Sequence, residues 1–249
     1  MTCQILICMS FPLERVKAFL ELVPSMRVEE VLRRIDHTQL KPMASKSDIV
    51  KLCDEAKRYG FYAVCVNPYY VPLASKLLSG TDIKISSVVG FPLGATFTEI
   101  KVAEAERSIR LGASEIDMVM NISAFKSGDL EYVKRDIREV RERIGDAILK
   151  VIIECCYLTD DEKILAAKIC EEEGADYVKT STGFGPGGAK LEDVRLLRKT
   201  LSPKVKIKAA GGIRTFEQAV KFIEAGADRI GTSSGVKIAE EGIRSAKTG

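Results

Sequence analysis

The sequence contains one histidine and no tryptophan. With His37 alone, the chain cannot assemble a zinc site from two or three histidines. Nor can it form a Ser-His or Cys-His catalytic pair that does not use His37. We therefore expect no histidine-based zinc site, and a Ser-His or Cys-His pair is possible only through His37. No cofactor is expected.

The cysteines are few, odd in number and without a Cys-x-x-Cys pair. They are Cys3, Cys8, Cys53, Cys65, Cys155, Cys156 and Cys170. Such a set is typical of reduced thiols, so we expect a cytoplasmic protein. Cys155 and Cys156 are neighbours on an expected strand, where their side chains point to opposite faces and do not bridge.

No apolar run is long enough to span a membrane. The moderately apolar stretch Thr2–Leu13 has no basic residue before it and no small-residue cleavage site after it, so we expect no secretory signal. The net charge of +3 is close to balance, and Lys and Arg form no block. Neither nucleic acid nor a membrane surface is an expected partner, whereas a small anionic substrate needs only a local positive site.

The length of 249 residues suits one eight-unit α/β barrel, and the 46% hydrophobic residues suffice for a large core. No linker or low-complexity segment divides the chain, so residues 26–249 are expected to form one domain. Residues 1–25 are expected to be an extension with a helix over Glu14–Val23. An alternative is that natural translation begins at Met26.

A quasi-repeat is visible at the glycines that end helical patterns. Gly60, Gly112, Gly174 and Gly226 each precede a short strand-like run, and they are spaced by roughly 50 to 60 residues. A strand–helix unit takes about 25 to 30 residues, so each interval holds two units. Eight units over the chain follow.

The local patterns agree with that count. We expect strands over 33–37, 61–66, 84–89, 115–120, 148–153, 176–180, 205–209 and 228–231, mostly continuous apolar runs of the kind covered on both faces. Helix starts are indicated by Ser45-x-x-Asp48, Thr96-x-x-Glu99, Thr159-x-x-Glu162 and Thr215-x-x-Gln218. A doubly wound open sheet would also fit the alternation, but no Gly-x-Gly-x-x-Gly turn follows the first strand. The prediction is a single (β/α)8 TIM barrel.

Two lysines lie where a buried strand should have none. Lys179 and Lys208 each end a short apolar run, and a buried ammonium is costly unless it is paired or used. Two ammonium groups that converge on one pocket would lower each other's pKa, which yields a nucleophilic amine for Schiff-base chemistry. Lys206 shares the parity of Lys208 but lies farther from the strand's C-terminal end, where barrel enzymes carry their catalytic groups. Asp117, taken as the one acid inside its strand, would handle protons.

Structural explanations compete with these roles. Lys179 could extend to solvent from its strand end or sit in a buried ion pair. Asp117 could be a purely structural partner of a lysine, and for Glu154 the structural role is preferred.

Two loops have the character of a phosphate site. The loops after the seventh and eighth strands of such barrels commonly bind phosphate through backbone N–H groups and a helix N-terminus. Here these loops read Ala210-Gly-Gly-Ile-Arg-Thr215 and Gly231-Thr-Ser-Ser-Gly235. Glycines let the backbone approach an anion, and Arg214 with the hydroxyls adds donors.

From Ile35 to Lys237 the sequence resembles the deoxyribose-phosphate aldolases, class I aldolases of the TIM-barrel type. The matching segments are 36–40 (DHTQL), 63–68 (AVCVNP), 89–94 (VGFPLG), 115–119 (EIDMV), 150–154 (KVIIE), 178–184 (VKTSTGF), 208–215 (KAAGGIRT) and 231–234 (GTSS). The Lys-Thr-Ser-Thr-Gly and Lys-Ala-Ala-Gly-Gly segments in this order are highly specific.

The resemblance implies reversible, metal-free cleavage of 2-deoxy-D-ribose 5-phosphate to acetaldehyde and D-glyceraldehyde 3-phosphate. By position, Lys179 matches the lysine that forms the Schiff base. Lys208 matches a second lysine that keeps Lys179 unprotonated and relays protons with Asp117. Thr38 matches a threonine near the relay's water, and the phosphate site matches Gly183, Gly211, Gly212, Ser233 and Ser234. The resemblance also implies a homo-oligomer, a dimer or a tetramer.

The sequence departs from the family pattern in places. Some members carry a lysine where this chain has Phe184, close to the phosphate, and some have a C-terminal tyrosine that this chain lacks. Lys206 stands where small residues are usual. Two alternatives to the aldolase remain: another class I barrel aldolase or transaldolase that takes a longer phosphosugar, and a non-catalytic phosphosugar-binding barrel. Lys179, Lys208 and Asp117 argue against the binder, which has no need of an amine pair.

Overall fold

The computed structural model describes residues 26–248. The helix expected over Glu14–Val23, and the extension of residues 1–25 that contains it, lie outside the described residues.

Eight parallel strands close into a barrel in sequence order. They are β1 (Ile35–Gln39), β2 (Ala63–Val66), β3 (Lys84–Val89), β4 (Glu115–Val119), β5 (Ile148–Ile152), β6 (Tyr177–Lys179), β7 (Lys206–Ala210) and β8 (Arg229–Thr232). Pairing of β8 with β1 closes the circle. Each predicted strand overlaps an observed one, and the predicted (β/α)8 TIM barrel is confirmed.

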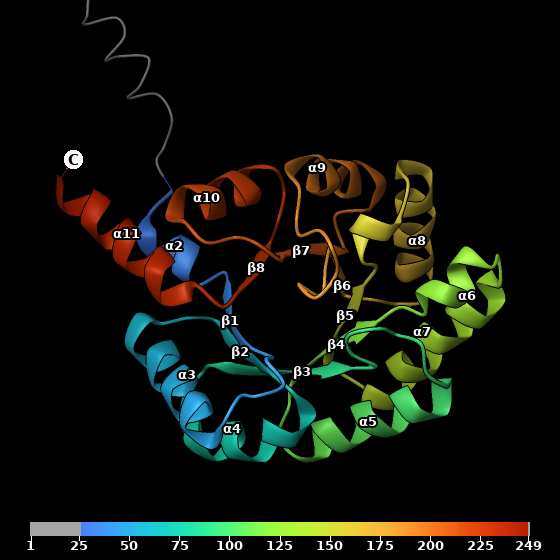
Figure 1. Ribbon diagram of the computed structural model, residues 1–249, viewed down its shortest axis with the longest axis horizontal. Helices are drawn as coiled ribbons and strands as arrows, with labels where there is room; N and C mark the ends of the chain where they lie inside the picture. Colours follow the sequence, from blue (N-terminus) through green and yellow to red (C-terminus); the bar gives the residue numbers. More distant parts are fainter. Residues whose placement is uncertain (1–25, 249) are drawn as a thin grey trace, which may run out of the picture.

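Helices follow the strands and surround the barrel (Figure 1). They are α2 (Val28–Leu32), α3 (Lys46–Tyr59), α4 (Val71–Leu77), α5 (Thr98–Arg110), α6 (Ile122–Lys126), α7 (Leu130–Ile144), α8 (Asp160–Glu172), α9 (Leu191–Thr200), α10 (Phe216–Glu224) and α11 (Gly235–Thr248), with 3-10 turns η1 (Pro68–Tyr70) and η2 (Cys155–Tyr157). The four repeat glycines all have positive φ, which explains why a residue without a Cβ ends each of these helical stretches.

Three of the four predicted helix starts are capping boxes. Ser45, Thr159 and Thr215 each accept a hydrogen bond from the third helical residue, whose side chain bonds back to the cap. The start predicted at Thr96 is wrong, because α5 begins two residues later, after Phe97. Thr96 instead belongs to the preceding turn, where its N–H donates to the Gly94 carbonyl.

A second local prediction also fails. Cys155 and Cys156 are not on a strand, because β5 ends at Ile152 and the chain turns sharply at Glu154, whose φ is +52°. Both cysteines lie in η2, and both are free. The predicted absence of a bridge between them is confirmed.

The strands divide their side chains between two environments. Alternate residues such as Ile116, Val151 and Ile207 belong to the large apolar core that includes buried residues of the helices. The residues between them point into the barrel, and on six strands these are charged. Because successive side chains of a strand point to opposite faces, the apolar residues pack outside the barrel wall and the charged residues lie inside the barrel.

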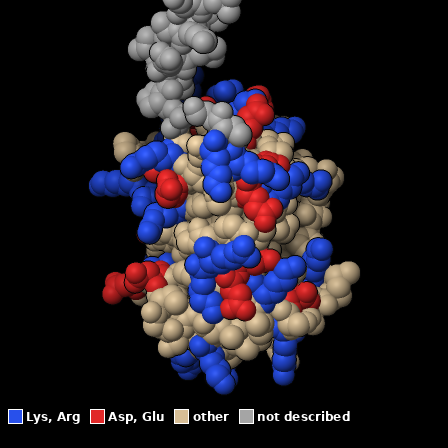
Figure 2. Space-filling view, turned by 90° about the vertical axis from the view of Figure 1, so that its left-hand side faces the viewer, with Lys and Arg blue, Asp and Glu red and all other residues tan. Residues whose placement is uncertain are grey.

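No helix in the described part of the chain is long and apolar enough to cross a membrane. Figure 2 shows one face of the molecule, on which basic and acidic side chains are interspersed.

Candidate active site

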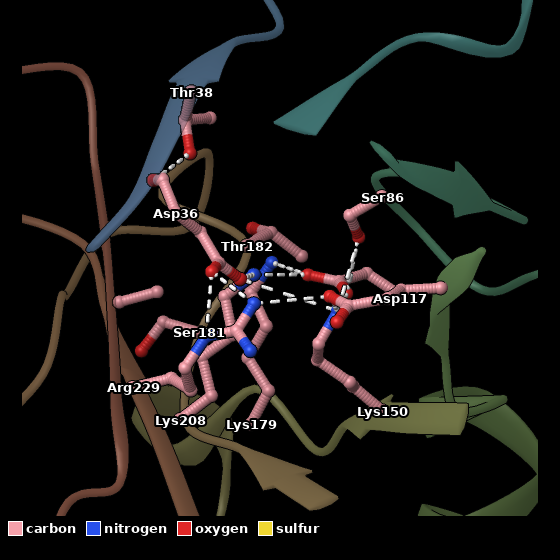
Figure 3. Close-up of polar contacts among 12 residues, drawn as sticks. Asp36, Thr38, Ser86, Asp117, Lys150, Lys179, Ser181, Thr182, Lys208 and Arg229 are labelled. Carbon is pink, nitrogen blue, oxygen red and sulfur yellow. Dashed lines mark hydrogen bonds and ion pairs between the residues drawn. The ribbon is translucent and has the colours of Figure 1, made fainter. Parts of the chain in front are cut away.

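The charged residues inside the barrel form one connected, buried cluster (Figure 3). Its members are Asp36 from β1, Glu115 and Asp117 from β4, Lys150 from β5, Lys179 from β6, Lys208 from β7 and Arg229 from β8. Each is at most 3% exposed. Burial of this many charges is tolerable only because each one meets an opposite charge.

Asp117 is the centre of the cluster. Its Oδ2 accepts hydrogen bonds from the Nζ of Lys179 at 2.8 Å and of Lys208 at 2.7 Å. Its Oδ1 accepts from Lys150 at 2.7 Å and from the Ser86 hydroxyl at 2.8 Å. The sequence-predicted trio of Lys179, Lys208 and Asp117 is therefore brought together within hydrogen-bond distance.

The expectation that the two ammonium groups lower each other's pKa is wrong for Lys208. Burial alone would lower the pKa of Lys208, but the carboxylates of Asp117 and Asp36 outweigh burial and raise it above its usual range. Lys208 contacts both carboxylates, whereas Lys179 forms an ion pair with Asp117 alone among residues 26–248. A carboxylate bridges the two amines, so they do not simply repel each other.

Burial also disfavours the charged form of the carboxylates, and nearby opposite charges again outweigh it. Burial raises the pKa of Asp117, yet the ammonium groups of Lys150, Lys179 and Lys208 hold it well below the usual range. Burial likewise raises the pKa of Asp36, and Arg229 with Lys208 and Lys150 lowers it further than burial raises it. Both carboxylates are therefore ionised at neutral pH and can hold nearby ammonium groups.

Sequence reasoning missed part of this cluster. Lys150 and Arg229 were given no role, and Glu115, the buried first residue of β4, shows that Asp117 is not the one acid in that strand. Glu115 contacts Lys150 at 2.6 Å and Arg229 at 3.0 Å. The signal was available: all three are charged residues within expected buried strands, as Lys179 and Lys208 are.

A pocket with a volume of about 360 Å³ opens at the C-terminal ends of the strands, and Lys179 is the one lysine of the cluster that lines it. Six of the seven predicted substrate-binding residues also line it: Thr38, Gly183, Gly211, Gly212, Arg214 and Ser233. Ser234 does not; it lines the adjacent pocket, to which Thr38 and Ser233 also contribute. The predicted residues thus gather at the mouth of the barrel, above the buried cluster.

Glycine is required at this mouth for two reasons. Gly183, Gly211 and Gly212 have φ between +81° and +94°, a region that residues with a Cβ rarely adopt. The Gly188 backbone also packs tightly on Gly211, where a Cβ at Gly188 would come within 2.3 Å of the Gly211 carbonyl oxygen. The N–H of Gly212 has no acceptor among residues 26–248 and is free to bind an anion.

Glu154 holds the loop after β6 in place. Its carboxylate accepts hydrogen bonds from the N–H and the hydroxyl of Thr182. Glu154 is 2% exposed, and it does not line the pocket that contains Lys179. The structural role preferred for Glu154 agrees with these contacts.

The described residues include no group of three or more His, Cys, Asp or Glu side chains that could hold a metal. The chemistry that the site can perform is that of an amine. A buried lysine that opens onto a small pocket, next to an ionised carboxylate, can attack a carbonyl and exchange protons nearby. Fold and site together define an α/β barrel that presents a buried lysine to a small pocket at its C-terminal mouth.

Comparison with known proteins agrees with that arrangement. The family model of the DeoC/LacD aldolases matches residues 31–241. The chain is 61% identical over 222 residues to the deoxyribose-phosphate aldolase of Thermococcus gammatolerans, which covers 88% of this chain and 98% of that protein. The chain therefore belongs to the DeoC/LacD aldolase family.

Solved structures are similar over the same region. The structure of an aldolase called QR15 is 46% identical with a TM-score of 0.84, and the match covers 88% of this chain and 98% of that one. The tetrameric deoxyribose phosphate aldolase from Aeropyrum pernix is 35% identical with a TM-score of 0.82, covering 93% of this chain and 97% of that one.

Proposed function

We propose that the protein is a lyase that reversibly cleaves 2-deoxy-D-ribose 5-phosphate to acetaldehyde and D-glyceraldehyde 3-phosphate through a Schiff base on Lys179. The observation that carries the assignment of the nucleophile is that Lys179 alone joins the buried cluster to the pocket. The family and the relatives named deoxyribose-phosphate aldolase support the reaction.

The number of carboxylate partners sets Lys179 apart from the other two lysines of the cluster. Fully ionised, the cluster has three carboxylates and four cations, an excess of one positive charge. Lys150 has carboxylates of three residues within 4.0 Å, Lys208 those of two, and Lys179 that of one. Lys179 therefore has the fewest carboxylate partners of the three lysines, and it is the one that opens onto the pocket.

The reaction then follows from the neighbours of Lys179. Its Nζ attacks the aldehyde carbon of the open-chain sugar, and loss of water leaves an iminium. Removal of the proton from the C3 hydroxyl breaks the C2–C3 bond, and the electron pair moves into the iminium to give an enamine and glyceraldehyde 3-phosphate. Protonation of the enamine and hydrolysis release acetaldehyde. Lys208 and Asp117 relay these protons, because Asp117 Oδ2 accepts hydrogen bonds from the Nζ atoms of both Lys179 and Lys208.

The phosphate is assigned to the mouth of the pocket. Gly183, Gly211 and Gly212 offer backbone N–H groups that a closely approaching anion can use. Ser233 and Ser234 directly precede α11, and Arg214 lies near the end of the loop between β7 and α10. Thr38, whose hydroxyl donates to the Asp36 carbonyl at 2.9 Å, borders the same space and can hold a water of the proton relay.

Three further proposals concern the domain organisation, the assembly and the compartment of the protein. We assign catalysis to residues 26–249, with residues 1–25 as an extension. The tetrameric relative supports a homo-oligomer, a dimer or a tetramer. The five free cysteines among the described residues support a reducing compartment, the cytoplasm.

Product analysis tests the reaction. The enzyme is incubated with 2-deoxyribose 5-phosphate, and acetaldehyde and glyceraldehyde 3-phosphate are quantified. Equal amounts of both are expected. Cleavage of a longer phosphosugar without acetaldehyde would instead support a transaldolase-like reaction, and phosphosugar binding without any product would support the non-catalytic barrel.

A further inference from the structure

The pocket above Lys179 is lined by basic residues and, within residues 26–248, by no carboxylate. Of the described residues, Lys41, Lys179 and Arg214 are the basic ones that border it, and no described Asp or Glu does. The neighbouring pocket, in contrast, is lined by Lys41, Lys51 and Lys237 together with three acids, Asp48, Glu55 and Glu240. A pocket bordered by one sign of charge attracts an anion, and a pocket of mixed charge does so far less.

Lys179 is not available to bind a phosphate, because its Nζ is held by Asp117 and is proposed to react with the carbonyl. Lys41 and Arg214 are both exposed, and neither forms an ion pair within residues 26–248. Most other charges near them are paired: Glu55 with His37, for example, and Lys237 with Glu241. Hydrogen bonds from Ser45 are the main reason that the pKa of Asp48 is lowered, and the charge of Lys41 adds to this effect. Lys41 and Asp48 are nevertheless too far apart to form an ion pair. Two unpaired cations at one mouth are therefore left for a ligand.

The order of strands in the barrel determines where these cations stand. Ser233 follows β8, Arg214 follows β7, and Lys41 follows β1. Since β7, β8 and β1 are consecutive neighbours in the closed barrel, the two cations flank the Ser233 loop on opposite sides. A phosphate bound at the start of α11 would have one cation on each side.

The loop after β6 offers no cation to the same space. Residue 184 is Phe184, half exposed, and its ring packs edge-on against Phe91 with centroids 5.3 Å apart. Phe184 lines the pocket, so an apolar ring borders the side away from β1. The loop cations at this mouth, Lys41 and Arg214, therefore follow β1 and β7, and none comes from the loop after β6.

Resting on the proposed function, we propose that Lys41 is a substrate-binding and specificity-determining residue, which pairs with Arg214 around the phosphate and favours the phosphorylated sugar over the unphosphorylated one. Lys41, in the loop between β1 and α3, thereby supplies a positive charge that Phe184 does not supply. The contribution of each residue is a charge-assisted contact that depends on ionic strength.

The test compares wild type with Lys41→Gln and Arg214→Gln, and Lys51→Gln is the matched control. Lys51 is an exposed lysine on the neighbouring helix that lines the mixed-charge pocket and not this one. The readout is the ratio of kcat/KM for 2-deoxyribose 5-phosphate to kcat/KM for 2-deoxyribose. The ratio is expected to fall by about 10-fold in Lys41→Gln and in Arg214→Gln, as for a lost hydrogen bond to a charged group, and to stay at the wild-type value in Lys51→Gln.

Calorimetric binding of inorganic phosphate gives a second readout that does not need the reaction. Its Kd is expected to rise by about 10-fold in Lys41→Gln at low salt, with a smaller difference at high salt. The proposal is overturned if Lys41→Gln keeps both the ratio and the Kd of wild type, or if Lys51→Gln changes them equally. If wild type releases no acetaldehyde, the proposed function fails while phosphate binding still tests Lys41.

Discussion

Two groups of buried charges in this molecule have pKa shifts in opposite directions, although burial disfavours the charged form in both. One is the barrel cluster around Asp117; the other is the helix-layer pair, Lys101 of α5 with Asp136 of α7, both fully buried. In the barrel cluster, Asp117 has a lowered pKa and Lys208 a raised one, despite burial. In the helix-layer pair, burial lowers the pKa of Lys101 and raises that of Asp136, and their mutual attraction does not reverse either change.

The difference lies in the number of partners. Asp117 has three ammonium groups around it, whereas Lys101 and Asp136 have essentially each other, with the Val119 carbonyl as a further acceptor for Lys101. A single pair rarely recovers the cost of desolvation, whereas several crossed pairs can. A buried lysine is therefore not by itself a sign of catalysis. What distinguishes Lys179 is a shared carboxylate below it and an open pocket above it.

The largest effect that separates the two groups is expected in Lys179→Met. Activity should fall by roughly four orders of magnitude or more, because no other residue can replace the nucleophile. The fold should survive, since Asp117 keeps Lys150 and Lys208 as partners. Circular dichroism and steady-state kinetics check both, with Lys206→Met, an exposed lysine on β7, as a control that should stay active. An active Lys179→Met enzyme would remove the central role of this lysine.

The opposite behaviour is expected in Lys101→Met. Removing one member of the pair leaves Asp136 buried without a cation, which should destabilise the protein by about 3–5 kcal/mol. The folded enzyme should keep its kcat, because Lys101 lies outside the barrel and away from the pocket. Urea unfolding at pH 7 measures the loss, and Lys101→Met/Asp136→Leu should recover most of it. A double variant as unstable as the single one would contradict the role of an unpaired charge.

A smaller effect distinguishes the two groups by pH. Lowered carboxyl pKa values in Asp36 and Asp117 stabilise the fold above the ordinary carboxyl value near 4, and this stability is lost as the pH falls below it. The raised pKa of Asp136 acts in the other direction, because its protonated form is favoured in the folded state. The unfolding free energy should therefore decline from about pH 4 downward. A decline at least as steep is expected in Asp136→Asn, because the opposing contribution of Asp136 is then absent; a flat profile in that variant would assign the acid sensitivity to the helix layer instead.

Much of this site could be predicted from the sequence. The barrel followed from the repeat glycines and the apolar strands, and the two lysines stood out because an ammonium is unusual in such a strand. The mouth was predictable because the C-terminal ends of barrel strands meet at one end.

What could not be predicted were the partners across the barrel. Arg229 meets Asp36 because β8 closes on β1, a contact between residues 193 positions apart, and nothing local specifies it. The same closure puts Asp36 next to Lys208. Together with Asp117, Asp36 raises the pKa of Lys208, which repulsion from Lys179 was expected to lower. The start of α5 was missed because the turn before it competes for Thr96.

The most direct test of the central claim is covalent trapping. The enzyme is incubated with 2-deoxyribose 5-phosphate or acetaldehyde and borohydride, and the intact mass and peptide map are measured. A reduced adduct on Lys179 is predicted. An adduct on Lys208 or Lys150, or no adduct in an enzyme that still binds phosphate, would contradict the assignment of Lys179 as the Schiff-base lysine.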